Sequence, residues 1–307
     1  GNAAYEAGNI SGAVLGLQAL TGGSGQHYGA LVSGALAFVL LWFGSSRVLE
    51  KIFTSLVLLM SLSFLLTAVL TKPDLLELVK GLFIPELKGE ELLTVVALIG
   101  TTVVPYNLFL YSSLVNEKWK TIGSISLMRT DILLSVLVGG LVSMAIVITA
   151  AGSGVESVRG VMELARGLEP VYGRMARYGI GVGLFAAGIT SAITAPLAAA
   201  FVARQCFGWP EDRKDWKFRL IWMLVLGVGV GTLSLDVRPL QVIFTAQVAN
   251  GILLPVVAFF LWWAINQTSL MRGYANSRLQ NLWTFLVLAL VTFLSIWSIF
   301  RILTDAF

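Results

Sequence analysis

Long apolar segments, separated by short polar stretches, follow one another along the whole chain. A helix that crosses a lipid bilayer needs ~20 predominantly apolar residues. Hydrophobic residues make up 57% of the 307 positions and charged residues only 12%, whereas a soluble domain of ordinary composition is about a quarter charged. The sequence therefore predicts an all-α polytopic membrane protein with about nine transmembrane helices.

The apolar segments predict where these helices lie. We expect them at 3–20, 27–45, 50–71, 92–116, 124–151, 176–205, 218–235, 239–265 and 281–303. The first segment carries Gly8, Gly12 and Gly16, a spacing of small residues that favours close helix packing. The polar stretch 72–91 is mixed in charge and has room for a short amphipathic helix.

Lysine and arginine gather at the predicted helix ends, which suits anionic lipid headgroups rather than nucleic acid. The loops before the third, fifth, seventh and ninth predicted helices hold twelve of the 21 basic residues. The positive-inside rule places this face of the protein in the cytoplasm, together with Gly1.

Several classes of function are excluded by what the chain lacks. His27 is the only histidine and Cys206 the only cysteine, so a histidine-rich metal site and a disulfide framework are excluded by count. No phosphate-binding loop and no metalloprotease motif is present. We therefore expect neither an enzyme nor an ATP-driven pump, and no cofactor is implied.

Pro105 interrupts the apolar segment 92–116. Proline removes a backbone donor and clashes with the preceding turn, and broken helix within a bilayer is tolerated only inside protein or beside a wet cavity. Discontinuous helices in transporters mark the substrate or ion site. Hard oxygen donors suited to Mg²⁺, Ca²⁺ or Mn²⁺ surround the break: Thr101, Thr102, Tyr106 and Asn107. The alternative is a kink that serves packing alone.

Three other sets of polar residues lie within apolar segments. Gln247 and Asn250, three residues apart, share one helix face and serve either a cation site or a bridge between helices. Glu6 is the only acid of the first helix, and acids within a membrane are functional candidates. The hydroxyl groups of the sixth helix can bond to their own backbone: Thr190, Ser191 and Thr194.

Four stretches resemble the NRAMP-type divalent metal transporters. Residues 100–115, Gly-Thr-Thr-Val-Val-Pro-Tyr-Asn-Leu-Phe-Leu-Tyr-Ser-Ser-Leu-Val, resemble the motif G-A-T-V-M-P-H-N-L-Y-L-H-S-A-L-V of that family's sixth helix. The weaker matches follow in the family's order: 183–194 with its eighth helix, 246–255 with its tenth, and 271–278 with the loop after it.

The resemblance implies a LeuT-like fold of two inverted five-helix repeats, with the ion between two broken helices. The nine predicted helices then correspond to the family's third to eleventh, and the first two, with their D-P-G-N metal-binding motif, are not in this chain. Residues 1–91 form the remainder of the first repeat. Residues 92–267 form the second repeat, broken near Pro105, and 268–307 add a C-terminal helix.

Two departures from the family pattern bear on the transported ion. The family's metal-binding methionine falls on Val104, which offers no ligand, and its histidine tied to proton movement falls on Tyr106. The resemblance implies Thr101, through its carbonyl, and Gln247 as ligands, with Asn250 beside them. The remaining residues of the site would shape it: Thr102, Val104, Tyr106 and Asn107. With both departures the chain resembles the NRAMP-related magnesium transporters. A site with few protein ligands suits Mg²⁺, because this ion dehydrates reluctantly and keeps several of its waters.

We therefore expect alternating-access transport of a divalent cation, with Mg²⁺ favoured over Mn²⁺, in the cell membrane (the inner membrane in a bacterium). The partners are the ion and the lipid bilayer; neither nucleic acid nor a protein partner is implied. The first alternative is a proton-coupled Mn²⁺/Fe²⁺ importer. There are two further alternatives. One is a non-transporting membrane scaffold or signalling domain on the same fold, and the other is a carrier of amino acids or organic cations.

Overall fold

A computed structural model gives the arrangement of the chain, and all of its regular structure is helical in the residues that it describes. Those residues are 1–22, 25–43, 47–84, 92–102, 125–152, 173–210, 212–233, 237–271 and 273–305, with the single positions 104, 108, 110–112, 115, 163, 165, 169 and 235.

Each predicted apolar segment contains a helix. The elements are α1 (Asn2–Thr21), α2 (Gln26–Phe43), α3 (Arg47–Leu70), α4 (Leu75–Phe83), α5 (Leu92–Thr102), α7 (Ile125–Gly152), the 3₁₀ turn η3 (Gly173–Met175), α10 (Ala176–Phe207), α11 (Trp216–Leu233), α12 (Pro239–Ile265), α13 (Thr268–Met271) and α14 (Arg278–Asp305). α4 is the short amphipathic helix expected within 72–91. The Asp74 side chain caps it by accepting hydrogen bonds from the backbone N–H groups of Leu76 and Glu77.

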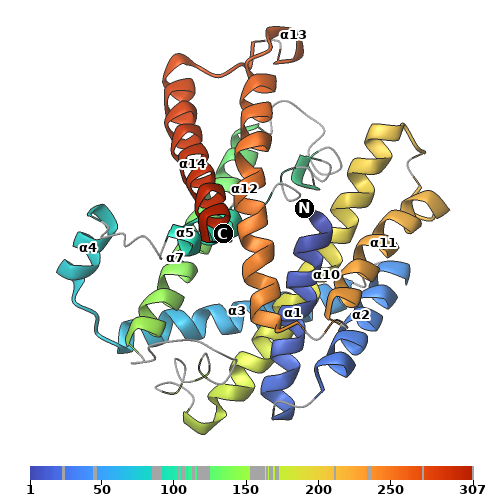
Figure 1. Cartoon of the computed structure of the whole chain (residues 1–307), viewed down its shortest axis with the longest axis vertical. Coiled ribbons are helices and arrows are strands. Elements are labelled where there is room, and N and C mark those ends of the chain that lie inside the picture. Colours follow the sequence, from blue (N-terminus) through green and yellow to red (C-terminus); the bar gives the residue numbers. More distant parts are fainter. Residues whose placement is uncertain are drawn as a thin grey trace.

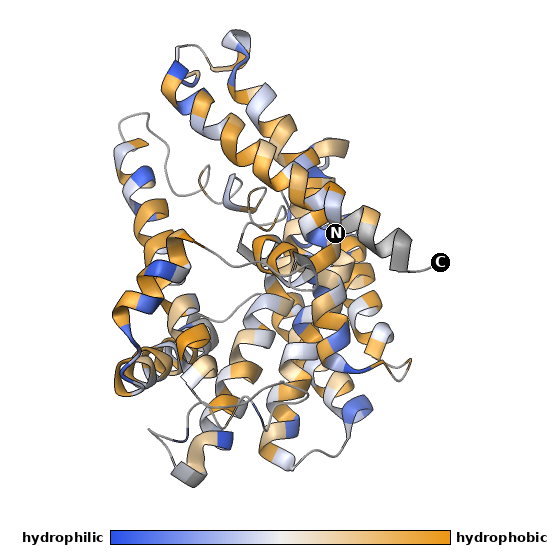
Figure 2. Cartoon of the chain, turned by 60° about the vertical axis from the view of Figure 1, so that its left-hand side comes forward, coloured by the Kyte–Doolittle hydropathy of each residue, from blue (hydrophilic) through white to orange (hydrophobic). Residues whose placement is uncertain are grey.

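Six helices of the described residues are long and apolar enough to cross a membrane: α2, α7, α10, α11, α12 and α14. Residues 54–70 of α3 and helix α4 together form a seventh such segment, bent by 115°. In Figure 2, hydrophobic residues dominate the long helices. The predicted class of an all-α polytopic membrane protein is confirmed.

α1 lies at the centre of the bundle, in contact with α2, α10, α11 and α12 (Figure 1). α3 packs between α10 and α7, and α12 separates α1 from α14. α5 packs along α12 and also contacts α14. The central position of α1 means that its polar side chains face other helices instead of lipid.

The contact between α1 and α10 is made by backbone. A Cβ atom at Gly16 would lie 2.6 Å from the carbonyl oxygen of Gly181, and one at Gly188 would lie 2.7 Å from the Cα of Ala13. Neither distance is compatible with a side chain. The close packing predicted from the small residues of the first helix is therefore confirmed.

Candidate ion site

Four polar side chains of α1 share one face of the helix at its N-terminal end. Asn2, Tyr5, Glu6 and Asn9 follow the spacing i, i+3, i+4, i+7, which places them along a single stripe. Glu6 is fully buried, with 0% of its surface exposed. The other three are partly buried.

This polar stripe lies at the depth of the middle of α12. A Cβ atom at Gly8 would lie 3.6 Å from Cβ of Ala246, and one at Gly1 would lie 3.9 Å from Cδ1 of Leu253. The two helices therefore run in opposite directions, and Glu6 lies beside the central turns of α12. A carboxyl group at this depth is far from either end of the bundle, where acids are rare and usually functional.

The two carboxylate oxygens of Glu6 have different surroundings. Oε2 accepts a hydrogen bond from Nδ2 of Asn9 at 3.3 Å. Oε1 is buried and has no hydrogen-bond partner among the described residues. An isolated buried charge is costly unless it is paired, protonated or bound to a cation, so Oε1 is the atom of this stripe most suited to bind a metal ion or a proton.

Val104 joins the start of α1 to α10. It is 7% exposed and packs against Ala195 and Ala198 of α10, with Tyr5 of α1 against the same cluster. Asn2 adds a polar contact there, since its Nδ2 donates to the carbonyl oxygen of Ala195 at 3.1 Å. The predicted site residue Val104 thus lies next to the polar stripe of α1.

α12 brings two amides to the same depth. Asn250 is 3% exposed and Gln247 is partly buried, and both belong to the turns that lie beside the first residues of α1. Gly251 allows α5 to approach, because a Cβ atom there would lie 2.6 Å from the carbonyl oxygen of Val96. α12 therefore holds its amides between α1 and α5.

The predicted break in the chain falls partly outside the described residues. α5 ends at Thr102, Val104 is not helical, and helix is present again at Leu108. Pro105, Tyr106 and Asn107 lie outside the described residues. The backbone of Thr101 and Thr102 belongs to the last turn of α5, and their side chains are likewise outside the described part. The roles expected of these five residues stay predictions.

The hydroxyl groups of Thr190 and Thr194 in α10 bond to their own helix, as expected. Thr190 donates to the carbonyl oxygens of Ala186 and Ala187 at 3.0 and 2.9 Å, and Thr194 donates to that of Thr190 at 2.8 Å. These bonds occupy the hydroxyl protons of both threonines, and their oxygen atoms can still accept hydrogen bonds.

Asn2, Tyr5 and Asn9 were not among the residues singled out from the sequence. Their regular spacing with Glu6 in a helix of alanine and glycine is the signal that would have found them. In the described residues no three or more histidine, cysteine, aspartate or glutamate side chains gather in one place. A cation here would therefore meet a single carboxylate with amide, hydroxyl and carbonyl oxygens.

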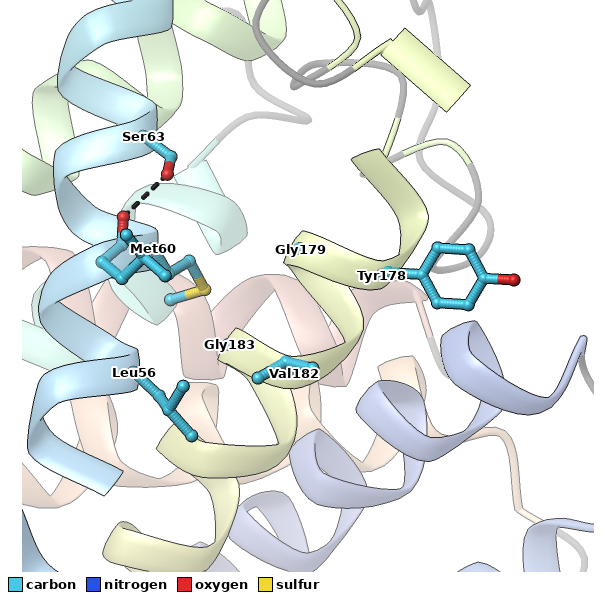
Figure 3. A pocket seen from close by; sticks show the side chains of 8 residues that line it. Leu56, Met60, Ser63, Tyr178, Gly179, Val182 and Gly183 are labelled. Atoms are coloured by element: carbon cyan, nitrogen blue, oxygen red, sulfur yellow. Dashed lines mark hydrogen bonds between the residues drawn. The ribbon is translucent and has the colours of Figure 1, made fainter. Parts of the chain in front are cut away.

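An apolar pocket of about 190 Å³ lies elsewhere, between α3 and α10 (Figure 3). Leu56, Met60 and Ser63 of α3 point towards α10, whereas the ring of Tyr178 points away from α3. The Ser63 hydroxyl donates to the carbonyl oxygen of Leu59 at 2.7 Å. With no acidic or amide side chain in its lining, this pocket is not suited to an ion.

Comparison with known proteins gives two kinds of sequence match. A model of the family described as "Nramp: Natural resistance-associated macrophage protein-like" matches residues 1–301. The chain is also similar to the divalent metal cation transporter MntH of Klebsiella pneumoniae (strain 342). The two sequences are 26% identical over 303 residues, which cover 94% of this chain and 70% of the relative.

Proposed function

The chain belongs to the Nramp family, and from this premise we propose that it transports a divalent metal cation across a membrane by alternating access. The similar protein from Klebsiella pneumoniae is named as a transporter of such cations. In this proposal the ion passes between α1, α10, α12 and the segment around Val104, at the depth of the polar stripe of α1. One group of helices would rock against the other to expose the ion to each side in turn.

The observation that carries the proposal is the buried carboxylate of Glu6. It is the only acid of α1, it lies midway along the neighbouring helix α12, and its Oε1 has no partner among the described residues. A packing role alone would favour an apolar side chain at this depth, because burying a carboxylate without full pairing costs free energy. A cation or a proton would supply the missing partner.

We favour Mg²⁺ over Mn²⁺ and Fe²⁺ as the ion. Softer sulfur ligands help to select transition metals, and Val104 contributes an apolar side chain where the family's pattern has methionine. The oxygen donors available are hard: the Glu6 carboxylate, the Gln247 and Asn250 amides, and in this proposal the carbonyl of Thr101. Mg²⁺ keeps several of its waters, so such a sparse set of ligands suits it.

Uptake into proteoliposomes tests the choice of ion. The full-length protein is reconstituted with a Mg²⁺-sensitive or a Mn²⁺-sensitive dye inside the vesicles, and each ion is added outside in turn. We expect Mg²⁺ entry above that of protein-free vesicles. Entry of Mn²⁺ or Fe²⁺ with no entry of Mg²⁺ would show that the choice of ion is wrong, and entry of no divalent ion would overturn transport itself.

The buried acid also favours a second candidate function, a proton-coupled importer of Mn²⁺ or Fe²⁺. A carboxyl group in an apolar bundle is suited to take up and release protons. A pH-sensitive dye inside the same vesicles distinguishes the two functions. Acidification that accompanies metal entry supports the importer, and metal entry at constant internal pH supports the uncoupled carrier.

A further inference from the structure

Pro255 interrupts the hydrogen bonding of α12 within the helix. In an α-helix the backbone N–H of each residue donates to the carbonyl oxygen four residues earlier, and proline has no N–H. The carbonyl oxygen of Gly251 therefore lacks the donor that position 255 would otherwise supply. Inside a bilayer, a carbonyl freed in this way is satisfied by a neighbouring helix, a hydroxyl side chain or an ordered water.

Ser295 of α14 supplies a donor to this carbonyl. Its Oγ lies 2.9 Å from the carbonyl oxygen of Gly251, and the side chain is buried, at 4% exposed. A serine within a helix commonly bonds to the carbonyl four residues earlier, and Ser295 also lies 2.8 Å from the carbonyl oxygen of Val291. The bond to α12 is additional to this ordinary arrangement, and it meets the carbonyl that Pro255 leaves without its helical partner.

Three helices meet at the backbone of Gly251. A Cβ atom there would lie 2.7 Å from Cγ1 of Val96 in α5, and Ser295 of α14 reaches the carbonyl oxygen. α5 and α14 also contact each other. A shift of this turn of α12 therefore moves a residue against which α5 packs, and α5 leads to the segment around Val104.

The turn of α12 that ends at Gly251 carries the two amides of the candidate ion site. Asn250 directly precedes Gly251, and Gln247 lies about one helical turn earlier. Pro255 removes a hydrogen bond that would join this turn to the next one. The position of both amides therefore depends in part on a contact from outside α12.

α14 is joined to α12 on both sides of Pro255. Ser295 bonds to the turn before the proline. Asn281 bonds to the end of α12 after the proline, through reciprocal hydrogen bonds with Asn266 at 2.9 and 2.7 Å. The two helices therefore run in opposite directions, side by side (Figure 1). The interrupted part of α12 is supported by α14 at each end.

We propose that Ser295 is a positioning residue of the ion site. Its hydroxyl group replaces the hydrogen bond that Pro255 removes, and it thereby holds the two amides of α12 where they meet the ion. This proposal rests on the transport function proposed above. Because the same hydroxyl also reaches the Val291 carbonyl, it keeps a partner in any conformation that moves α12 away from α14.

Ser295→Ala tests the proposal, because it removes only the hydroxyl group. Uptake of Mg²⁺ and of Mn²⁺ into proteoliposomes gives the half-saturating ion concentration and the maximal rate. For an ion that the unchanged protein carries, the variant should raise the half-saturating concentration about threefold, the equivalent of one average hydrogen bond within a membrane. The maximal rate should change less. Ser295→Thr keeps a hydroxyl group and should restore the value of the unchanged protein.

A second substitution shows whether the hydroxyl group acts through the Gly251 carbonyl. Pro255→Ala gives position 255 an N–H that can donate to this carbonyl, so the hydroxyl group is no longer needed. Ser295→Ala should therefore raise the half-saturating concentration when proline is present and leave it unchanged in the Pro255→Ala background. The melting temperature in detergent without added ion should follow the same pattern.

Thr284→Ala is the matched control. It removes a hydroxyl group of α14 that donates to the carbonyl oxygen of Gln280 in its own helix, at 2.8 Å. Neither the half-saturating concentration nor the melting temperature should change.

Two results with the variants would overturn the proposal. An equal effect of Ser295→Ala in both backgrounds would mean that the hydroxyl group does not act through Gly251. A lower melting temperature with an unchanged half-saturating concentration would mean that the hydrogen bond serves packing alone. Failure of the proposed function is recognised separately, since the unchanged protein would then carry neither ion. The role of Ser295 in the ion site would fall with it, while the melting temperatures would still show whether the bond to Gly251 stabilises the protein.

Discussion

Glu6 occupies space that Gly229 leaves open. A Cβ atom at Gly229 would lie 2.6 Å from Cγ of Glu6, so the buried acid of α1 fits against α11 only because that position has no side chain. Asn9 holds one carboxylate oxygen from the same helix. The position of the carboxylate is therefore set jointly by the two helices.

Glu6→Gln should lower transport by about tenfold or more while the protein stays folded. Glutamine has nearly the same shape and keeps an oxygen that can accept from Asn9, but it can carry neither the charge nor a titrating proton. Losing a charged contact to the ion corresponds to about 1.5–3 kcal/mol, or a tenfold or greater loss of uptake. Proteoliposome uptake and thermal unfolding measure the two effects separately.

The matched control is Glu77→Gln, which changes an exposed acid of α4. Uptake should be unaffected by it. Full uptake by the Glu6→Gln variant would contradict a role for this carboxyl group in handling the ion.

Gly229→Ala should destabilise the protein and displace Glu6. The added methyl group would overlap the side chain of Glu6 and approach the α1 backbone, 3.2 Å from the nitrogen of Ala7. Overpacking of this kind costs about 1–3 kcal/mol of unfolding free energy. Gly227→Ala is the control in the same helix, since no atom lies within 4 Å of the position its Cβ would take.

We expect the melting temperature in detergent to fall for Gly229→Ala and to stay the same or rise slightly for Gly227→Ala. Equal melting temperatures for the two variants would mean that α1 and α11 are not in this close contact.

Val104→Met should improve the binding of soft cations such as Cd²⁺. Methionine would place a thioether among oxygen donors at a buried position beside Ala195 and Ala198. A gain of about tenfold in affinity, 1.4 kcal/mol, is the expected scale for one added ligand. Competition of Cd²⁺ against Mg²⁺ for the purified protein measures it.

Val104→Leu is the control for size, because it adds volume without sulfur. A similar gain in Cd²⁺ affinity for both variants, or for neither, would count against Val104 lying at the ion site.

Asn281→Ala should loosen the connection between α12 and α14. The Oδ1 atom of Asn281 accepts from Nε1 of Trp262 at 3.0 Å and from Nδ2 of Asn266 at 2.9 Å, and its own Nδ2 donates to Oδ1 of Asn266 at 2.7 Å. Removing it leaves partly buried donors unpaired, at a cost of about 1–3 kcal/mol. Thermal unfolding should show a lower midpoint for Asn281→Ala, whereas Gln267→Ala nearby should leave the midpoint unchanged.

The positions of the helices could be predicted from the sequence, because each is a long apolar segment bounded by polar residues. The expected segment 176–205 is observed as α10, and 239–265 coincides with α12. The short helix α4 was also foreseeable, since Asp74 is a typical N-terminal cap. Such features depend on neighbours in the chain, which the sequence displays directly.

The surroundings of Glu6 could not be predicted in the same way. Its depth follows from the pairing of Gly8 with Ala246, and its fit follows from Gly229, contacts between residues far apart in the chain. Periodicity identifies which face of α1 is polar but not which helix covers it. The same holds for Val104, whose neighbours Ala195 and Tyr5 come from two other helices.

The backbone contact of Gly16 and Gly188 between α1 and α10 has a mechanical consequence. A contact between two backbones contains no rotatable side chain that could adjust when one helix slides along the other. The two helices must therefore move together as one rigid unit. The packing can adjust more easily on the opposite face of α10. There the flexible thioether of Met60 lies against Gly183 at the edge of a cavity. During a transport cycle α3 would therefore move relative to α10, while α1 and α10 keep their positions relative to each other.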